Sequence, residues 1–408
     1  MGGGRRAGGQ GRRGTPRLWC IPPAMLRDPG DGLEGDRILA ETPDDLGLLL
    51  WRTVMDVTLW ATAPDEKRGN LFADGTADAR IALLAATEVP EKVSASVDTL
   101  HGMLSIPSRA DAEVVALCCL EVAAWARGAG LPHTAVAFAQ AGAVAAPQFG
   151  EAALHVGLYA RGAGQDARAE TWLRRAVDLS RRERNRLAYS SALGELGALY
   201  ERRENALEAE RFYRLAYRAA GRYGARPVRM RAAHGLFRLA RQQSDDGSAS
   251  QFALSAQRAY EPDAAGGADL LLDLARFWTD SGEQARARAA LRRLVPALLN
   301  MPPAARLAAL ALTARARAEW GNLRAGVTAA SAAWALLGDD RINERVRYAA
   351  AVDLAHAARV AGDLPAFTRA KRLVLRLASQ AEFPDAVERM ATLWPDGDDP
   401  ASVMERAS

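Results

Sequence analysis

Apolar residues recur at intervals of three and four positions through most of the chain, which is the spacing of one face of a helix. Leu193, Leu196 and Tyr200 follow this spacing, and Ala209 and Tyr213 resume it after a short polar stretch. Two such runs with a brief polar break between them predict two successive helices that fold back on each other. We therefore predict an all-α protein.

The helical pattern itself repeats along the chain. The tetrapeptide Arg-Gly-Ala-Gly occurs at residues 127–130 and again 34 residues later at 161–164, each time with an alanine five residues beyond it. A small residue recurs at this place with spacings of 34, 40, 40, 38, 39 and 40, at Ala135, Ala169, Ala209, Ala249, Ala287, Gly326 and Ala366. A weaker eighth copy runs through Ala95, Gly102 and Pro107. Because one helix pair leaves apolar faces uncovered, about seven copies predict a stacked array.

In these residues the chain resembles the tetratricopeptide repeat, a unit of about 34 residues built from two packed helices. One copy matches six of the repeat's seven marked positions, with Gly221 where proline is usual, at Leu196, Gly197, Tyr200, Ala209, Tyr213 and Ala216. The resemblance implies an α-solenoid of stacked antiparallel helix pairs wound into a right-handed superhelix, in which small side chains make room for large ones. Because spacings of 38 to 40 residues exceed the usual 34, we expect helices longer by about one turn, or longer turns such as residues 244–248.

The pattern divides the chain into four parts. Residues 1–36 are a basic tail rich in glycine and arginine, and residues 37–108 are an N-terminal helical cap with room for one degenerate repeat. Residues 109–382 hold about seven repeats, and residues 383–408 hold a closing helix and a tail. Within the cap, residues 43–62 are apolar on nearly every side, which favours a buried helix.

Apolar runs and cysteines bear on where the protein resides. The N-terminal tail lacks the apolar core of a secretion signal, and no run approaches the length that crosses a bilayer. Three cysteines, two of them adjacent at Cys118 and Cys119, are too few for a disulfide framework. We therefore expect a cytoplasmic protein with no membrane partner.

Residue types that carry out catalysis or bind metals lack the necessary spacing. No two of the five histidines stand three or four residues apart, as a helical zinc site requires, at His101, His133, His155, His234 and His356. The glycines of residues 127–130 and 161–164 follow no predicted strand and precede no Lys-Ser or Lys-Thr, so we interpret them as helix turns rather than phosphate loops. The chain also has no Gly-x-Ser-x-Gly elbow. We expect no enzyme activity, no cofactor and no metal.

Charge is distributed unevenly along the chain. The formal net charge is only +4, yet residues 161–243 hold 19 arginines against nine acidic residues. Lysine occurs only at Lys67, Lys92 and Lys371, so the composition as a whole favours arginine. The basic middle nevertheless stands out from the rest of the chain, and such an asymmetry influences which partners the protein attracts.

The resemblance also implies where a partner would bind. In the repeat family, fixed positions of each first helix line the inner surface, and here they are mostly arginine. These predicted groove residues are Arg127, Arg161, Arg202, Arg231, His234, Arg238, Arg241, Arg276, Arg315 and Arg359. A guanidinium group can engage a carboxylate through two parallel hydrogen bonds, which favours an acidic ligand. The alternative interpretation is a solvated arginine face that follows from composition alone.

We predict a non-enzymatic scaffold or adaptor that binds a peptide or protein segment, acidic by preference, in this arginine-lined groove. One alternative is a nucleic-acid-associated protein that uses the basic middle together with its tyrosines, at Tyr189, Tyr200, Tyr213, Tyr217 and Tyr223. Another is a regulatory protein that senses a peptide.

Overall fold

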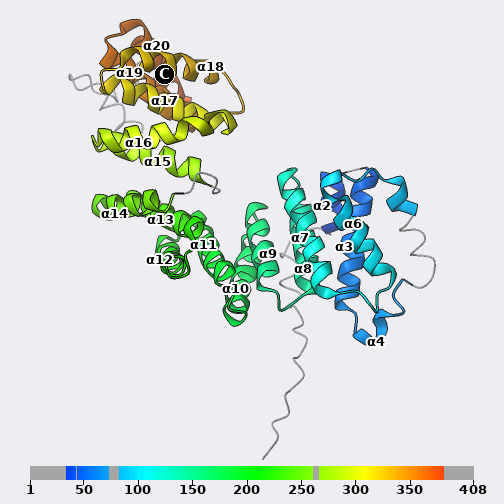
Figure 1. The fold of residues 1–408 in the computed structure, drawn as a ribbon. Coiled ribbons are helices and arrows are strands. Elements are labelled where there is room, and N and C mark those ends of the chain that lie inside the picture. Colours follow the sequence, from blue (N-terminus) through cyan, green and yellow to red (C-terminus); the bar gives the residue numbers. More distant parts are fainter. Residues whose placement is uncertain (1–33, 43, 73–81, 261–265, 381–408) are drawn as a thin grey trace, which may run out of the picture. The chain divides into compact units, whose positions relative to one another are not determined.

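Every regular element that the structure describes is a helix (Figure 1). The computed structural model describes residues 34–42, 44–72, 82–260 and 266–380. The chain divides into two compact units, Met1–Ala259 (the N-terminal unit) and Tyr260–Ser408 (the C-terminal unit). This boundary falls inside the stretch for which the repeat spacing predicted one uninterrupted array. The closing helix predicted after residue 382 and most of the basic tail lie outside the described residues.

The N-terminal unit begins with the cap. Its helices are α2 (Glu34–Glu41), α3 (Asp45–Thr62), α4 (Asp65–Arg68) and α6 (Glu91–Ser105). Trp60 of α3 is buried, and its indole nitrogen donates a hydrogen bond to the carbonyl oxygen of Pro107 at 2.8 Å. Leu48, Met55 and Leu59 share one face of the same helix and are exposed. The expectation that α3 is buried on nearly every side is therefore wrong for this face.

Four helix pairs follow the cap in the N-terminal unit. They are α7 (Ala112–Gly128) with α8 (Pro132–Ala145), α9 (Gly150–Gly162) with α10 (Asp166–Arg182), α11 (Arg186–Arg202) with α12 (Ala206–Tyr223), and α13 (Arg226–Gln242) with α14 (Asp246–Arg258). The second helices α8, α10 and α12 also pack on the first helix of the next pair, and successive first helices of this unit contact one another. This layering is the predicted stacking of antiparallel pairs, whereas the right-handed superhelix stays a prediction.

Three more pairs make up the described part of the C-terminal unit. They are α15 (Gly267–Asp280) with α16 (Gln284–Leu294), α17 (Pro303–Glu319) with α18 (Leu323–Leu336), and α19 (Glu344–Ala361) with α20 (Leu364–Gln380). A short 3-10 helix, η1 (Val295–Asn300), continues from α16. The first helix α17 packs against both α18 and α19. The all-α class predicted from the apolar spacing is thus confirmed for the described residues.

Small residues hold the two helices of each pair close together. Five of the recurrent alanines are completely buried, at Ala135, Ala169, Ala209, Ala249 and Ala287. Gly326 is buried as well, and Ala366 is half-buried. Ala95 is exposed, so the weak eighth copy does not place its alanine in a helix contact. Elsewhere the repeated small side chain allows the close helix approach that the sequence predicted.

Tyr213 shows why glycine is needed at two further positions. A Cβ atom at Gly197 of α11 would lie 2.6 Å from Cδ1 of Tyr213, and one at Gly235 of α13 would lie 2.5 Å from its Cε2. Both distances are well inside van der Waals contact. The ring therefore fills a space between α11 and α13 that only two glycines leave open.

The turn within each pair contains a residue in the left-handed conformation. These residues have φ between 56° and 79° and stand at equivalent places, at Gly130, Gly164, Glu204, Ser244, Gly282, Gly321 and Gly362. The Arg-Gly-Ala-Gly segments are accordingly helix turns. Since α13 ends at Gln242 and α14 begins at Asp246, the expected longer turn at residues 244–248 is wrong. The period of 40 residues comes instead from helices of 17 and 18 residues, such as α11 and α12.

None of the helices in the described ranges combines the length and the apolar character required to cross a membrane.

Candidate first-helix surface

All ten predicted groove residues lie on first helices of their pairs. Arg127 belongs to α7, Arg161 to α9 and Arg202 to α11, while α13 carries Arg231, His234, Arg238 and Arg241. The other three belong to the C-terminal unit, with Arg276 on α15, Arg315 on α17 and Arg359 on α19. The structure therefore distributes the predicted set over two surfaces, one on each unit.

His234 differs from the other members of the set because its ring is buried. It stacks on Phe237 with ring centroids 6.4 Å apart, within α13. Its ring therefore belongs to the packing of the unit rather than to the solvent-facing surface. Arg231 and Arg241 on the same helix are exposed, and Arg127 of α7 is exposed with its guanidinium 5.7 Å from the ring centroid of Tyr159.

In the N-terminal unit, carboxylates of α11 reach the first helices on both sides. Glu195 accepts two contacts from Arg161 of α9, at 2.8 Å and 3.1 Å. Glu201 accepts two hydrogen bonds from Arg238 of α13, at 2.9 Å and 2.7 Å. We call these four residues the α11 ladder. Because the pairs cross from helix to helix, they fix the relative positions of α9, α11 and α13.

Arg202 of α11 contacts Arg161, one of the two arginines of the α11 ladder. Arg202 donates a hydrogen bond to the carbonyl oxygen of Arg161 at 2.6 Å and forms an ion pair with Asp166. Burial, and then the positive charges of Arg161 and Arg203, lower the pKa of Arg202. The guanidinium groups of Arg161, Arg202 and Arg203 therefore lie close together at the C-terminal ends of α9 and α11.

The ladder exposes its cations more than its anions. The side chain of Arg161 is 28% exposed and that of Glu195 is 14% exposed. For Arg238 and Glu201 the values are 40% and 15%. A guanidinium group has five N–H donors, and the contacts to one carboxylate occupy two of them. The remaining donors of Arg161 can therefore bind an anionic or carbonyl-rich ligand from solution.

The corresponding surface of the C-terminal unit is centred on one buried acid. Asp353 of α19 is 2% exposed and contacts Arg276 of α15 at 2.8 Å and Arg315 of α17 at 3.4 Å. Arg315 also contacts Asp280 at 3.0 Å and Glu319 at 2.9 Å. The charge of Asp353 raises the pKa of Arg276 despite its burial. In the C-terminal unit, Arg276 and Arg315 therefore form ion pairs with carboxylates of their own unit.

Sequence reasoning identified the arginines and missed their carboxylate partners. The signal was present for three of the pairs, which are separated by about one repeat, whereas Arg276 and Asp353 are 77 residues apart. Arg161 and Glu195 are 34 residues apart, Glu201 and Arg238 are 37 apart, and Arg315 and Asp353 are 38 apart. Opposite charges at the repeat spacing on first helices therefore predict a bridge between neighbouring pairs.

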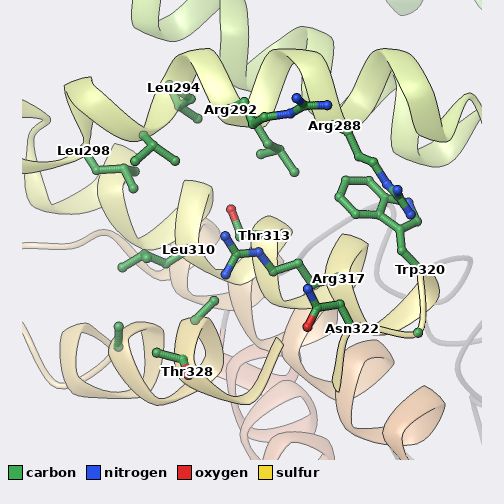
Figure 2. A pocket seen from close by; sticks show the side chains of 15 residues that line it. Arg288, Arg292, Leu294, Leu298, Leu310, Thr313, Arg317, Trp320, Asn322 and Thr328 are labelled. Carbon is green, nitrogen blue, oxygen red and sulfur yellow. The ribbon is translucent and has the colours of Figure 1, made fainter. Parts of the chain in front are cut away.

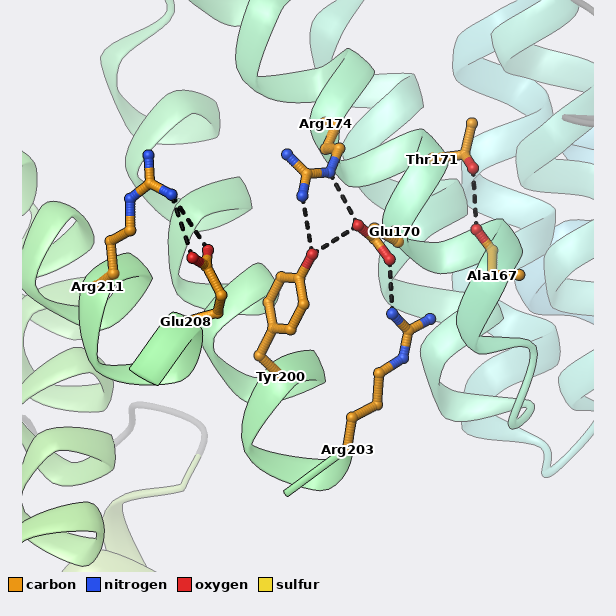
Figure 3. Close-up of polar contacts among 8 residues, drawn as sticks. All are labelled: Ala167, Glu170, Thr171, Arg174, Tyr200, Arg203, Glu208 and Arg211. Atoms are coloured by element: carbon orange, nitrogen blue, oxygen red, sulfur yellow. Dashed lines mark hydrogen bonds and ion pairs between the residues drawn. The ribbon is translucent and has the colours of Figure 1, made fainter. Parts of the chain in front are cut away.

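A second polar cluster is centred on Glu170 of α10 (Figure 3). Glu170 accepts hydrogen bonds from Tyr200 at 2.6 Å, from Arg203 at 2.5 Å and from Arg174 at 3.0 Å. Burial would raise the pKa of Glu170, but these hydrogen bonds outweigh it and lower the pKa to about 2. Glu170 and Arg174 also line a cavity of about 390 Å³ along α10. Both acidic and basic side chains line this cavity.

The stability that Glu170 provides is expected to vanish in acid. Because its folded-state pKa is depressed, its contribution is complete above its ordinary value of 4.5 and is lost as the pH falls toward about 2. Glu170→Gln should therefore lower the free energy of unfolding more at pH 6 than at pH 3, as measured by urea titration. The control is Asp178→Asn, which removes an exposed i,i+3 pair on the same helix and should cost under about 1 kcal/mol. An equal effect of Glu170→Gln at both pH values would contradict the expectation.

Two of the five tyrosines of the basic middle serve the packing of the unit. Tyr200 and Tyr213 are buried, and their hydroxyl groups donate to Glu170 and Glu201, each at 2.6 Å. Burial, followed by the charge and hydrogen bond of Glu201, raises the pKa of Tyr213. Tyr189, Tyr217 and Tyr223 are half-buried. Two of the five rings therefore cannot stack on nucleobases without unpacking the helix pairs.

Candidate metal-ligating and thiol side chains can be placed in the described parts of the chain. No group of three or more histidine, cysteine, aspartate or glutamate side chains gathers there as a metal ion would require. Cys119 is buried in α7, and burial raises its pKa, so its thiol is a poor nucleophile.

Comparison with known proteins adds similarities of fold at low sequence identity. No family model and no curated protein matches the chain. The crystal structure of BtubC (BKLC) from P. vanneervenii matches over 55% of this chain and 90% of that chain, with 15% identity and a TM-score of 0.39. The structure of a Rap protein complexed with competence and sporulation factor matches over 83% of this chain and 99% of that chain, with 10% identity and a TM-score of 0.42. At these scores the chain is similar to both proteins only in its general helical arrangement, and its function has to be argued from its own residues.

Proposed function

We propose that the N-terminal unit is a non-enzymatic binding module that holds an acidic segment of a partner protein on the first helices α9, α11 and α13. The observation that carries this proposal is the α11 ladder, in which each arginine is more exposed than the carboxylate that holds it. A partner approaching this surface meets guanidinium groups first.

The ladder also lowers the cost of binding. A free arginine side chain loses rotamer freedom when it binds a ligand, and this loss opposes association. Arg161 and Arg238 are already held by two contacts each, so less freedom remains to be lost. The excess of arginine over acid in residues 161–243 adds a field that steers acidic segments toward this unit. The resemblance to the tetratricopeptide repeat supports the same surface.

The proposal predicts selective, salt-sensitive binding of acidic peptides to the full-length protein. On a peptide array, acidic sequences should bind better than neutral sequences of the same length, and high ionic strength should weaken that binding because it screens exposed charges. Equal binding of acidic and neutral peptides at low ionic strength would contradict the proposal. A salt-dependent shift of nucleic acid in a gel, with no peptide selectivity, would favour the alternative of a nucleic-acid-associated protein.

Substitutions can assign such binding to the ladder. Arg161→Gln together with Arg238→Gln should weaken acidic-peptide binding by at least about tenfold, because two charge-assisted contacts are lost. The control is Arg181→Gln together with Arg211→Gln, which removes the same charge from exposed i,i+3 pairs on the second helices α10 and α12. If both double variants lose affinity equally, net charge rather than the ladder determines binding.

A further inference from the structure

The C-terminal unit contains a cavity of about 800 Å³ whose lining includes none of the ten predicted groove residues. Residues of α16 and η1 line one side, and residues of α17 and α18 line the other (Figure 2). Its apolar lining includes Leu291, Leu298, Leu310 and Trp320. The volume lies within the range typical of sites for small organic ligands.

Three arginines line this cavity, and no acidic residue is found among the described residues that line it. Arg288 and Arg292 lie on α16, while Arg317 extends from α17 into the space between the two sides (Figure 2). Arg288 places its guanidinium 4.8 Å from the ring centroid of Trp320, and Arg317 donates a hydrogen bond to the carbonyl oxygen of Ala325 at 3.2 Å.

These arginines differ from those of the α11 ladder in their charge balance. None of the three forms an ion pair with a carboxylate in the described ranges, whereas Arg161 and Arg238 each have one. Three guanidinium groups around one cavity create a positive potential that an anion would relieve. The charge of the site therefore favours an anionic ligand.

The apolar residues of the cavity favour a ligand that carries an aliphatic chain in addition to its negative charge. Val295 at the start of η1 is exposed, and no residue of η1 is buried. Leu298 and Leu310 are half-buried on opposite sides of the cavity. An aliphatic chain placed between these side chains would remove apolar surface from water, which is favourable in proportion to the area covered.

We propose that this cavity binds a small amphipathic carboxylate, with its aliphatic chain along Leu298 and Leu310 and its carboxylate at Arg292 and Arg317. The ligand class combines the two properties of the lining, an apolar surface and an unbalanced positive charge. The site lies in a different unit from the proposed peptide surface, so either proposal can fail without the other.

Calorimetric titration of the full-length protein with decanoate, below its micelle concentration, tests the proposal. Decanoate should bind saturably, while decyltrimethylammonium, which has an alkyl chain only one carbon longer and the opposite charge, should not bind. A leucine-rich peptide with a free carboxyl terminus should bind more weakly than decanoate. Absence of saturable decanoate binding, equal binding of the cationic compound, or tighter binding of the peptide would each overturn the proposal.

Substitutions of the cavity arginines test whether decanoate binds in this cavity. Arg292→Gln together with Arg317→Gln should weaken decanoate binding by about tenfold or more, since both contacts to the carboxylate are lost. A control for the loss of one nearby charge is Arg324→Gln, because Arg324 is an exposed arginine of α18 that does not line the cavity. Arg161→Gln with Arg238→Gln should also leave decanoate binding unchanged. Circular dichroism should show the same helix content in all variants, and decanoate binding unaltered by Arg292→Gln with Arg317→Gln would refute the assignment.

Discussion

Asp353→Ala should destabilise the C-terminal unit by about 3 kcal/mol, because it leaves two largely buried guanidinium groups without their shared partner. Asp353 contacts Arg276 and Arg315 and thereby joins α15, α17 and α19. Once the carboxylate is removed, the two positive charges repel each other in a region with little access to water. Hydrogen exchange followed by mass spectrometry should show faster exchange of the amides in these three helices.

A matched substitution separates this effect from simple loss of an ion pair. Glu283→Ala removes a carboxylate from the same unit whose i,i+3 partner Arg286 is exposed, with a nitrogen–oxygen distance of 3.5 Å. Exposed pairs of this kind contribute under about 1 kcal/mol, so exchange in the three helices should hardly change. Similar effects of Glu283→Ala and Asp353→Ala would show that the buried position of Asp353 is unimportant.

Gly235→Ala should destabilise the N-terminal unit by about 2 kcal/mol, and Gly197→Ala should have a similar effect. Each added methyl group would overlap the ring of Tyr213, at 2.5 Å from Cε2 or 2.6 Å from Cδ1. The ring cannot move away from one glycine without approaching the other, and its hydroxyl group is held by Glu201. Urea titration monitored by circular dichroism measures the loss.

Gly194→Ala is the control for these two variants. Gly194 lies on α11 together with Gly197, but a Cβ atom there would meet only Cβ of Ala216, at an ordinary 3.9 Å. Because alanine is the better helix former, this variant should be neutral or should raise stability by up to about 1 kcal/mol. A loss as large as that of Gly235→Ala would mean that chain flexibility, rather than the ring of Tyr213, explains the need for glycine.

The helix pairs could be predicted from the sequence because their determinants are local. Apolar spacing defines each helix, and the small residue near the start of each second helix, such as Ala169 or Ala209, marks where the two helices touch. The left-handed turn residues stand at the same register even where glycine is replaced by Glu204 or Ser244. Periodic features of this kind reinforce one another from copy to copy, so a weak signal in one repeat is supported by the others.

The sequence by itself thus determined the helical class, the pairing and the row of arginines on first helices. Only the tertiary structure decided how those arginines are used, because several charges stand at the repeat spacing and the stacking of the pairs selects Glu195, Glu201 and Asp353 as the partners. It also revealed the cavity beside Arg317, which arises where the consecutive elements α16, η1, α17 and α18 leave a gap between them. Periodicity specifies which face of a helix is buried, whereas charge balance and cavities depend on side chains that meet only after the pairs have stacked.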